Sequence, residues 1–100
     1  MSSNDDQTAL AHRLLGVAQE VLASRVDDPA VAEKLALGEA AYWFRMMNKN
    51  SLSRHEAFGV SEADMSAAVI TWQHIQHNNE VVAADLRTAF LETSKKRGFS

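Results

Sequence analysis

The sequence contains no cysteine, a single proline and only four glycines in 100 residues. Without cysteine there is no disulfide framework, no zinc–thiolate site and no thiol nucleophile. So little proline and glycine leaves no room for a flexible interdomain linker. Because the length is typical of one compact domain, we predict a single helical domain over residues 1–100, with residues 1–5 as a loose N-terminal tail.

The chain also lacks a surplus of positive charge. It carries 13 acidic and 10 basic residues, a net charge of −3, which excludes a strongly basic nucleic-acid binder or a polybasic membrane-surface protein. The N-terminal MSSNDDQ has neither the basic start nor the apolar run of a signal peptide. The longest nearly apolar stretch, Ala40–Met47, is too short to span a bilayer. We therefore expect a soluble, intracellular protein without a membrane partner.

Hydrophobic spacing predicts two helices in the first half of the chain. The first runs from near Asp5 or Asp6 to about Ser24, with an apolar stripe at Leu10, Leu14, Val17 and Val21. A second helix begins at Pro29, capped by Asp28, and runs to about Asn48. Its stripe contains Val31, Leu35, Gly38 and Tyr42, and its second half is apolar nearly all round, which is typical of a central helix.

Three further helices are predicted in the second half. Ser53-x-x-Glu56 reads as a capping box that opens a short helix closed by Gly59, and Ser61-x-x-Asp64 opens a helix over about 62–77. Asn78-Asn79 breaks this helix, and the last one covers about 80–96 before a glycine cap at Gly98. Inward-facing positions are predicted at Met65, Ala68, Val69, Trp72 and Ile75, then at Val82, Leu86, Ala89 and Phe90. The fold class is therefore all-α: a compact bundle of about five helices, one of them short.

The residue patterns give weak support to catalysis or metal binding. His74-x-x-His77 places two imidazoles on one helical face, but a metal site needs three or four ligands, and only Glu80 lies near. Ser53 and His55 are close in sequence, yet capping explains the serine better than nucleophilic catalysis does. We predict no catalytic residues, no metal site and no cofactor, and we do not expect an enzyme.

The segment Ser53–Trp72 resembles a helix-turn-helix. Its Gly-Val-Ser turn and Met65, six residues after Gly59, match the turn and packing positions of that motif. His55 stands where a small packed residue is usual, and the second helix opens with acidic residues and contains no Lys or Arg. Phosphates repel such a surface, so we interpret the motif as a helical corner and consider direct duplex-DNA binding unlikely. A regulator that uses Lys95, Lys96 and Arg97 instead is the alternative.

Acidic residues dominate the stretch from His55 to Asp85, which contains five acids and no Lys or Arg. Such a stretch can dock on a basic protein surface, although a solvated outer face is the other interpretation. The aromatic run Tyr42-Trp43-Phe44 cannot face one way on a helix. Either this helix is buried on several sides, or one ring is exposed and serves a homodimer interface.

The chain as a whole resembles the small, acidic, single-domain helical proteins that phages and mobile elements encode as anti-CRISPR inhibitors. Its length, its lack of cysteine and active-site motifs, and the acidic stretch from Glu56 to Asp85 carry this resemblance. The resemblance implies a protein that acts in the cytoplasm of a bacterial host. There it would bind an RNA-guided surveillance complex and block target-DNA binding or nuclease recruitment.

This resemblance assigns no individual residue, so the predicted partner-binding residues come from charges and helix breaks alone. The expected partner is a protein or a ribonucleoprotein complex. The predicted contacts are Glu56, Glu62, Asp64, Asn78 and Asn79, with Lys49 and Arg54 alongside.

Overall fold

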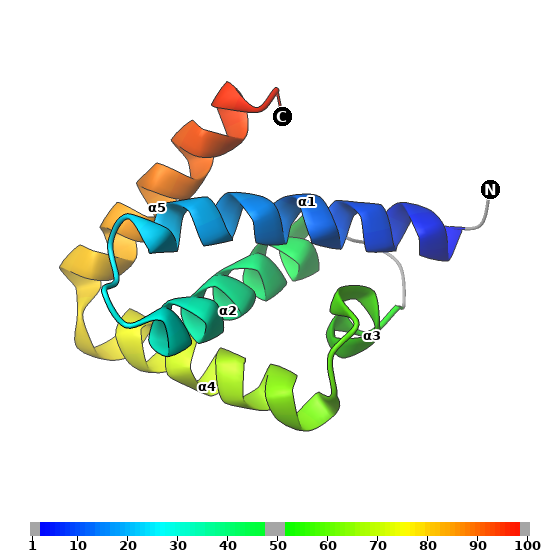
Figure 1. Ribbon diagram of the computed structural model, residues 1–100, viewed down its shortest axis with the longest axis horizontal. Coiled ribbons are helices and arrows are strands. Elements are labelled where there is room, and N and C mark those ends of the chain that lie inside the picture. The colour runs from blue at the N-terminus through cyan, green and yellow to red at the C-terminus, as the bar shows by residue number, and fades with distance from the viewer. Residues whose placement is uncertain (1–2, 48–51, 99–100) are drawn as a thin grey trace.

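A computed structural model describes residues 3–47 and 52–98 of the chain, and its elements are helices (Figure 1). They are α1 (Ser3–Ala23), α2 (Pro29–Met47), α3 (Arg54–Phe58), α4 (Glu62–Asn78) and α5 (Glu80–Lys96). These ranges contain no strand, so the all-α prediction with one short helix is confirmed. None of these helices is long and apolar enough to cross a membrane.

The first helix begins earlier than predicted. It starts at Ser3, so residues 3–5, which we expected in a loose tail, are helical. Asp5 and Asp6 lie in its first turn, where negative charge interacts favourably with the positive end of the helix dipole. The same acidic residues that indicated a helix start are thus inside the helix.

Two of the predicted helix caps are present, and a third cap forms at the predicted helix break. An Asp28 side-chain oxygen accepts a hydrogen bond from the Ala30 N–H at 3.0 Å, beside Pro29. Ser61 Oγ accepts from the Asp64 N–H at 3.1 Å. Asn79 separates α4 from α5, and its side chain accepts from the Val82 N–H at 3.2 Å. Each of these side chains satisfies a backbone donor that the first helical turn leaves unpaired.

The predicted capping box at Ser53 is wrong. Ser53 occupies the N-cap position, but its hydroxyl makes no cap hydrogen bond. The hydroxyl instead donates to the carboxylate of Glu56. A charged acceptor makes a stronger hydrogen bond than a neutral one, so the two side chains pair with each other rather than with the backbone.

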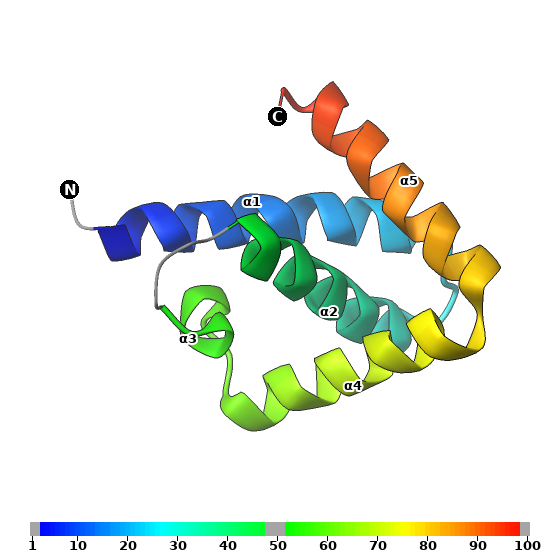
Figure 2. The same ribbon diagram turned by 180° about the vertical axis from the view of Figure 1, so that it is seen from behind.

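Helix α2 lies at the centre of the molecule. It packs between α1 and α4, while α3 lies at one end of the bundle and α5 crosses α1 near the C-terminal end of α1 (Figures 1 and 2). Its three consecutive aromatic residues all have partners: Phe44 is buried against Phe58, Tyr42 stacks on Trp72 and Trp43 stacks on Phe90. The helix is therefore buried on several sides, and no ring of this run stands free.

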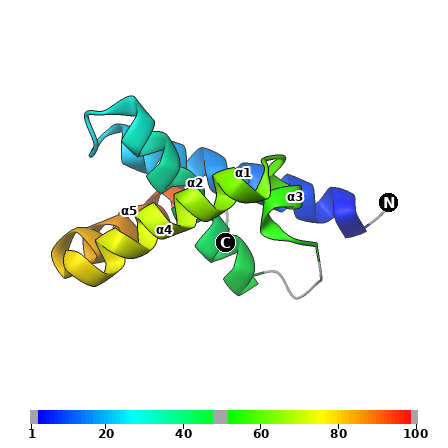
Figure 3. The same cartoon turned by 90° about the horizontal axis from the view of Figure 1, so that it is seen from below.

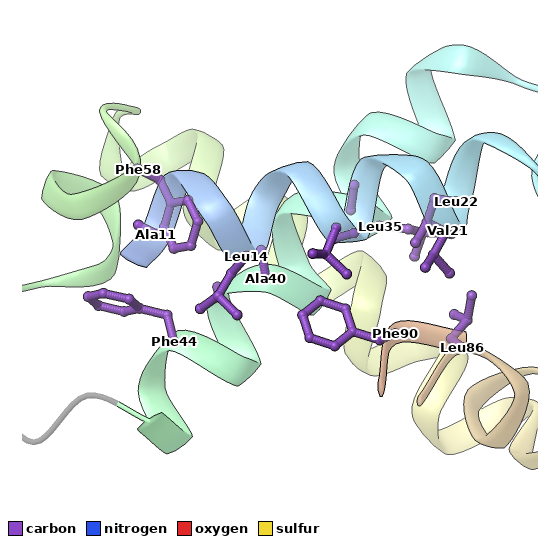
Figure 4. Close-up of a cluster of buried hydrophobic side chains, with 14 of the residues drawn as sticks. Ala11, Leu14, Val21, Leu22, Leu35, Ala40, Phe44, Phe58, Leu86 and Phe90 are labelled. Atoms are coloured by element: carbon purple, nitrogen blue, oxygen red, sulfur yellow. The ribbon is translucent and has the colours of Figure 1, made fainter. Parts of the chain in front are cut away.

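The core draws on every helix (Figure 4). Its largest fully buried side chains are Leu14, Val17, Leu22, Phe44, Leu86 and Phe90. Two predicted core positions are wrong, because Val31 is 39% exposed and Val82 is 38% exposed. Both residues lie in the first turn of their helices.

Helix α4 runs across α2 (Figure 3). Gly38 determines how closely the two helices approach each other. A Cβ atom added to Gly38 would lie 2.5 Å from Trp72 Cβ and 2.8 Å from the carbonyl oxygen of Ala68. Both distances are too short for non-bonded atoms. The absence of a side chain at Gly38 therefore allows α2 to approach α4 closely.

Candidate functional site

The α3–α4 segment forms the predicted helical corner. Gly59 has a left-handed backbone with φ of 69°, and its N–H donates to the carbonyl oxygen of Glu56 at 3.2 Å. The next N–H, from Val60, donates to the carbonyl oxygen of His55 at 3.0 Å. These bonds end α3 and direct the chain into α4, whose Met65 is buried as the helix-turn-helix pattern predicts.

The surface of this corner carries acidic rather than basic groups at the start of α4. Glu62 and Asp64 are both exposed, and the whole of α4 contains no Lys or Arg. In a DNA-binding helix-turn-helix these first residues of the second helix would face the bases and phosphates. The exposed carboxylates make that contact electrostatically unfavourable.

The predicted acidic residues share the corner but do not form one flat patch. Glu62 borders a hollow of about 590 Å³ on the side of α3, together with Arg54 and His55. Asp64 borders a separate hollow of about 310 Å³ on the side of α2, near Glu33 and Lys34. Residues two positions apart on a helix point about 200° apart, which explains the separation. Glu56 is exposed on α3, where its carboxylate accepts the Ser53 hydrogen bond.

The other predicted contacts lie elsewhere. Asn78 and Asn79 are at the far end of α4, a helix of 17 residues that is about 25 Å long. Their side chains serve local structure: Asn79 caps α5, and the Asn78 amide lies 3.5 Å from His74 Nδ1. Arg54 is half-buried at the start of α3, whereas Lys49 lies outside the described residues.

Ser53, His55 and Glu56 meet at the start of α3 without forming a nucleophilic triad. Ser53 Oγ lies 3.3 Å from His55 Nδ1 and also donates to the Glu56 carboxylate. In a triad the carboxylate orients the histidine, and the histidine alone contacts the serine. Here both groups contact the serine, so the arrangement stabilises the local turn.

The histidine pair of α4 does not belong to a larger ligand set. His74 and His77 are both exposed. Throughout residues 3–47 and 52–98, no group of three or more His, Cys, Asp or Glu side chains is placed to hold a metal ion. Glu80, the third ligand we considered, starts α5 beyond the helix break and does not complete such a group.

Sequence reasoning missed a buried carboxyl group at the centre of the molecule. Glu39 is only 3% exposed, and its two oxygens accept hydrogen bonds from Trp43 Nε1 at 2.7 Å and Trp72 Nε1 at 2.8 Å. Trp43 lies one turn further along α2, so that half of the arrangement was visible as a four-residue spacing. The other half depends on Trp72, which is 33 residues away, and no local signal indicates it.

Comparisons with known proteins place the chain in no family. It matches no protein-family model, no curated protein and no solved structure.

Proposed function

We propose that the protein is a non-catalytic protein-binding module that docks on a basic partner surface through the acidic α3–α4 corner. The corner is defined here by Glu56, Glu62 and Asp64. The observation that carries the proposal is that all three carboxylates are exposed and none makes an ion pair with a described residue. Unpaired carboxylates are available to the Lys and Arg side chains of a partner, and such charges raise association rates and set specificity.

Two ion pairs between described residues lie outside the corner. Arg25 pairs with Asp85 at 2.6 Å, and Arg97 pairs with Glu20 at 3.5 Å. The first pair links the turn after α1 to α5. The second links the end of α1 to the residue that follows α5. Asp85 and Glu20 are thus partly neutralised, whereas the three carboxylates of the corner make no ion pair with a described residue.

The partner we propose is an RNA-guided surveillance complex of a bacterial host, and the action we propose is inhibition. Two arguments support this choice: the resemblance to anti-CRISPR proteins, and the chemistry of such complexes. They hold nucleic acid in a positively charged channel. A compact acidic protein that occupies part of this channel would exclude target DNA.

The test begins with an affinity pull-down from bacterial lysate at low and moderate salt, followed by association kinetics with the recovered partner. We expect a surveillance-complex subunit, recovered stoichiometrically. Substituting Glu56→Gln, Glu62→Gln and Asp64→Asn together should slow association at least about tenfold, with a smaller effect at high salt.

A matched control separates the corner from net charge. The variant Asp27→Asn, Glu80→Gln, Glu92→Gln removes the same charge from exposed positions outside the corner, and it should associate nearly as fast as the wild type. Equal loss in both variants would refute a specific role for the corner. Recovery of nuclease-sensitive DNA without protein would refute the inhibitor proposal and favour the helix-turn-helix regulator.

A further inference from the structure

A third hollow opens beside the crossing of α2 and α4, and it shares Arg54 with the hollow that Glu62 borders. It has a volume of about 290 Å³, and residues of α2, α3 and α4 line it. Gly38 lies at its edge, where the two helices are in closest contact. The other side chains that matter for its chemistry are Tyr42, Arg45, Met46, Arg54, Trp72 and Gln73.

Two arginines bring positive charge to this hollow from different elements. Arg45 is exposed near the end of α2, and Arg54 is half-buried at the first position of α3. Neither makes a hydrogen bond or an ion pair with any residue of the described ranges. No Asp or Glu lines the hollow. Two unpaired guanidinium groups favour the binding of a carboxylate or a phosphate. Each guanidinium can bind such an anion with two parallel hydrogen bonds.

The side chains of Tyr42 and Trp72 form an aromatic wall of the hollow beside these arginines. Tyr42 and Trp72 stack with ring centroids 5.0 Å apart and an angle of 29° between their planes. The Trp72 indole cannot turn freely, because its Nε1–H donates to the buried Glu39. Met46, which is 65% exposed, adds a flexible apolar side chain at the rim. The wall is therefore held in place before any ligand arrives, which lowers the entropic cost of binding.

We infer that this hollow is a binding site for a small aromatic anion, that is, a ring bearing a carboxylate or phosphate group. Arg45 and Arg54 bind the anionic group, and the ring packs against Tyr42 and Trp72. The volume is at the lower end of the range for small-molecule sites, so it suits one ring and one anionic group rather than a large cofactor. The inference does not depend on the proposed function, because the acidic corner contributes no residue to the hollow.

The test uses phenyl phosphate and benzoate as probes, with two-dimensional NMR of ¹⁵N-labelled protein. The chain has two tryptophans, which give two separate indole N–H signals. We expect saturable shifts of the Trp72 indole signal and of the Gln73 backbone signal at millimolar probe. The Trp43 signal should move less, because that ring borders a different hollow, formed with Phe90 and Leu91.

Probes that carry only the anionic group or only the ring show whether both parts of the ligand contribute to binding. Inorganic phosphate lacks the ring and phenol lacks the anion, so both should bind at least about tenfold more weakly than phenyl phosphate. If inorganic phosphate binds as tightly, the aromatic wall has no role and the inference is overturned. If phenol binds as tightly, the arginines have no role and the inference is likewise overturned.

Variants complete the test. Arg45→Gln and Arg54→Gln should each weaken phenyl phosphate binding at least about tenfold. Arg87→Gln, at an exposed arginine of α5 outside the hollow, should leave it unchanged. Circular dichroism checks that each variant is folded. Equal binding by the wild type and both hollow variants, or no saturable shift at millimolar probe, would refute the site. The acidic-corner variant should bind the probe normally, so the two proposals can fail independently.

Discussion

Glu39 connects two aromatic pairs through a single buried carboxyl group. The Trp43 and Trp72 indoles donate to different oxygens of this carboxyl group, and each ring stacks on a further aromatic side chain. A buried donor that loses its acceptor costs about 1–3 kcal/mol. The contribution of Glu39 to stability is therefore tied to its role as a double acceptor.

We expect Glu39→Ala to lower the free energy of unfolding by about 2–4 kcal/mol, because both indole donors lose their acceptor. Glu39→Gln should cost less, about 1–2 kcal/mol, since the amide oxygen still accepts one hydrogen bond while the amide NH₂ faces the other donor. Urea unfolding followed by circular dichroism measures both values. Glu33→Gln, at an exposed position of the same helix, is the control and should change stability little. A Gln variant as stable as the wild type would contradict this role.

At the scale of elements, the two glycines within helices have opposite surroundings. A Cβ atom at Gly38 would meet Trp72 Cβ and the backbone of Ala68, neither of which can move aside without shifting α4. A Cβ atom at Gly16 would meet only the terminal Nη1 of Arg97, at 3.1 Å. That side chain is flexible and can give way.

Substitution by alanine should therefore have opposite effects on the free energy of unfolding at the two glycines. In a helix, alanine is favoured over glycine by about 1 kcal/mol. Gly16→Ala should keep much of this gain, whereas overpacking at Gly38 should cost about 1–3 kcal/mol and outweigh it. Thermal and urea unfolding measure the stability of the two variants relative to the wild type. A stabilised Gly38→Ala protein would show that α2 and α4 can separate freely.

The two serine caps offer a second comparison between elements. Ser61 accepts a backbone hydrogen bond at the start of α4, whereas Ser53 bonds to a side chain at the start of α3. Ser61→Ala should lower the free energy of unfolding by about 1 kcal/mol, a typical value for a lost N-cap. Ser53→Ala should lower the free energy of unfolding by less than half of the Ser61→Ala value, because no backbone donor loses a partner. Equal losses in urea unfolding would argue against the distinction.

The elements were predictable from sequence because their boundaries are set locally. Pro29, Gly59 and Asn79 act on backbone groups within a few residues, and the helix bounds follow from them. The error at Ser53 is local, because its hydroxyl bonds to the nearby Glu56 side chain, but those at Val31 and Glu39 depend on distant chain segments. The exposure of Val31 depends on which helix covers the first turn of α2, and the bonding of Glu39 depends on Trp72. Neither is encoded in spacing along one helix.

At the scale of the whole molecule, the predicted binding residues were only partly brought together. The short turn at Gly59 places Glu56, Glu62 and Asp64 near the α3–α4 corner, although Glu62 and Asp64 border separate hollows there. Asn78 and Asn79 are separated from them by the length of α4. The arginine-lined hollow could not be predicted, since it requires the crossing of α2 and α4 that Gly38 allows.

The whole molecule should also unfold as one unit, because every helix contributes to a single core. Phe90 tests this point, since it is 2% exposed and stacks on Trp43 with planes 4° apart, joining α5 to the central helix. Phe90→Ala should lower the free energy of unfolding by about 3–5 kcal/mol, a large part of the stability of a small domain. Leu91→Ala, at a 45% exposed neighbour, should cost below about 1 kcal/mol.

Two signals distinguish cooperative from stepwise loss of structure in these variants. Far-ultraviolet circular dichroism follows all helices, whereas tryptophan fluorescence follows the surroundings of Trp43 and Trp72. If α5 is part of one cooperative unit, both signals should give the same urea midpoint in the wild type and in Phe90→Ala, shifted together in the variant. If helical signal is lost in the variant before the fluorescence changes, α5 is a separately unfolding element. In that case the aromatic stack would be a surface contact rather than part of the common core.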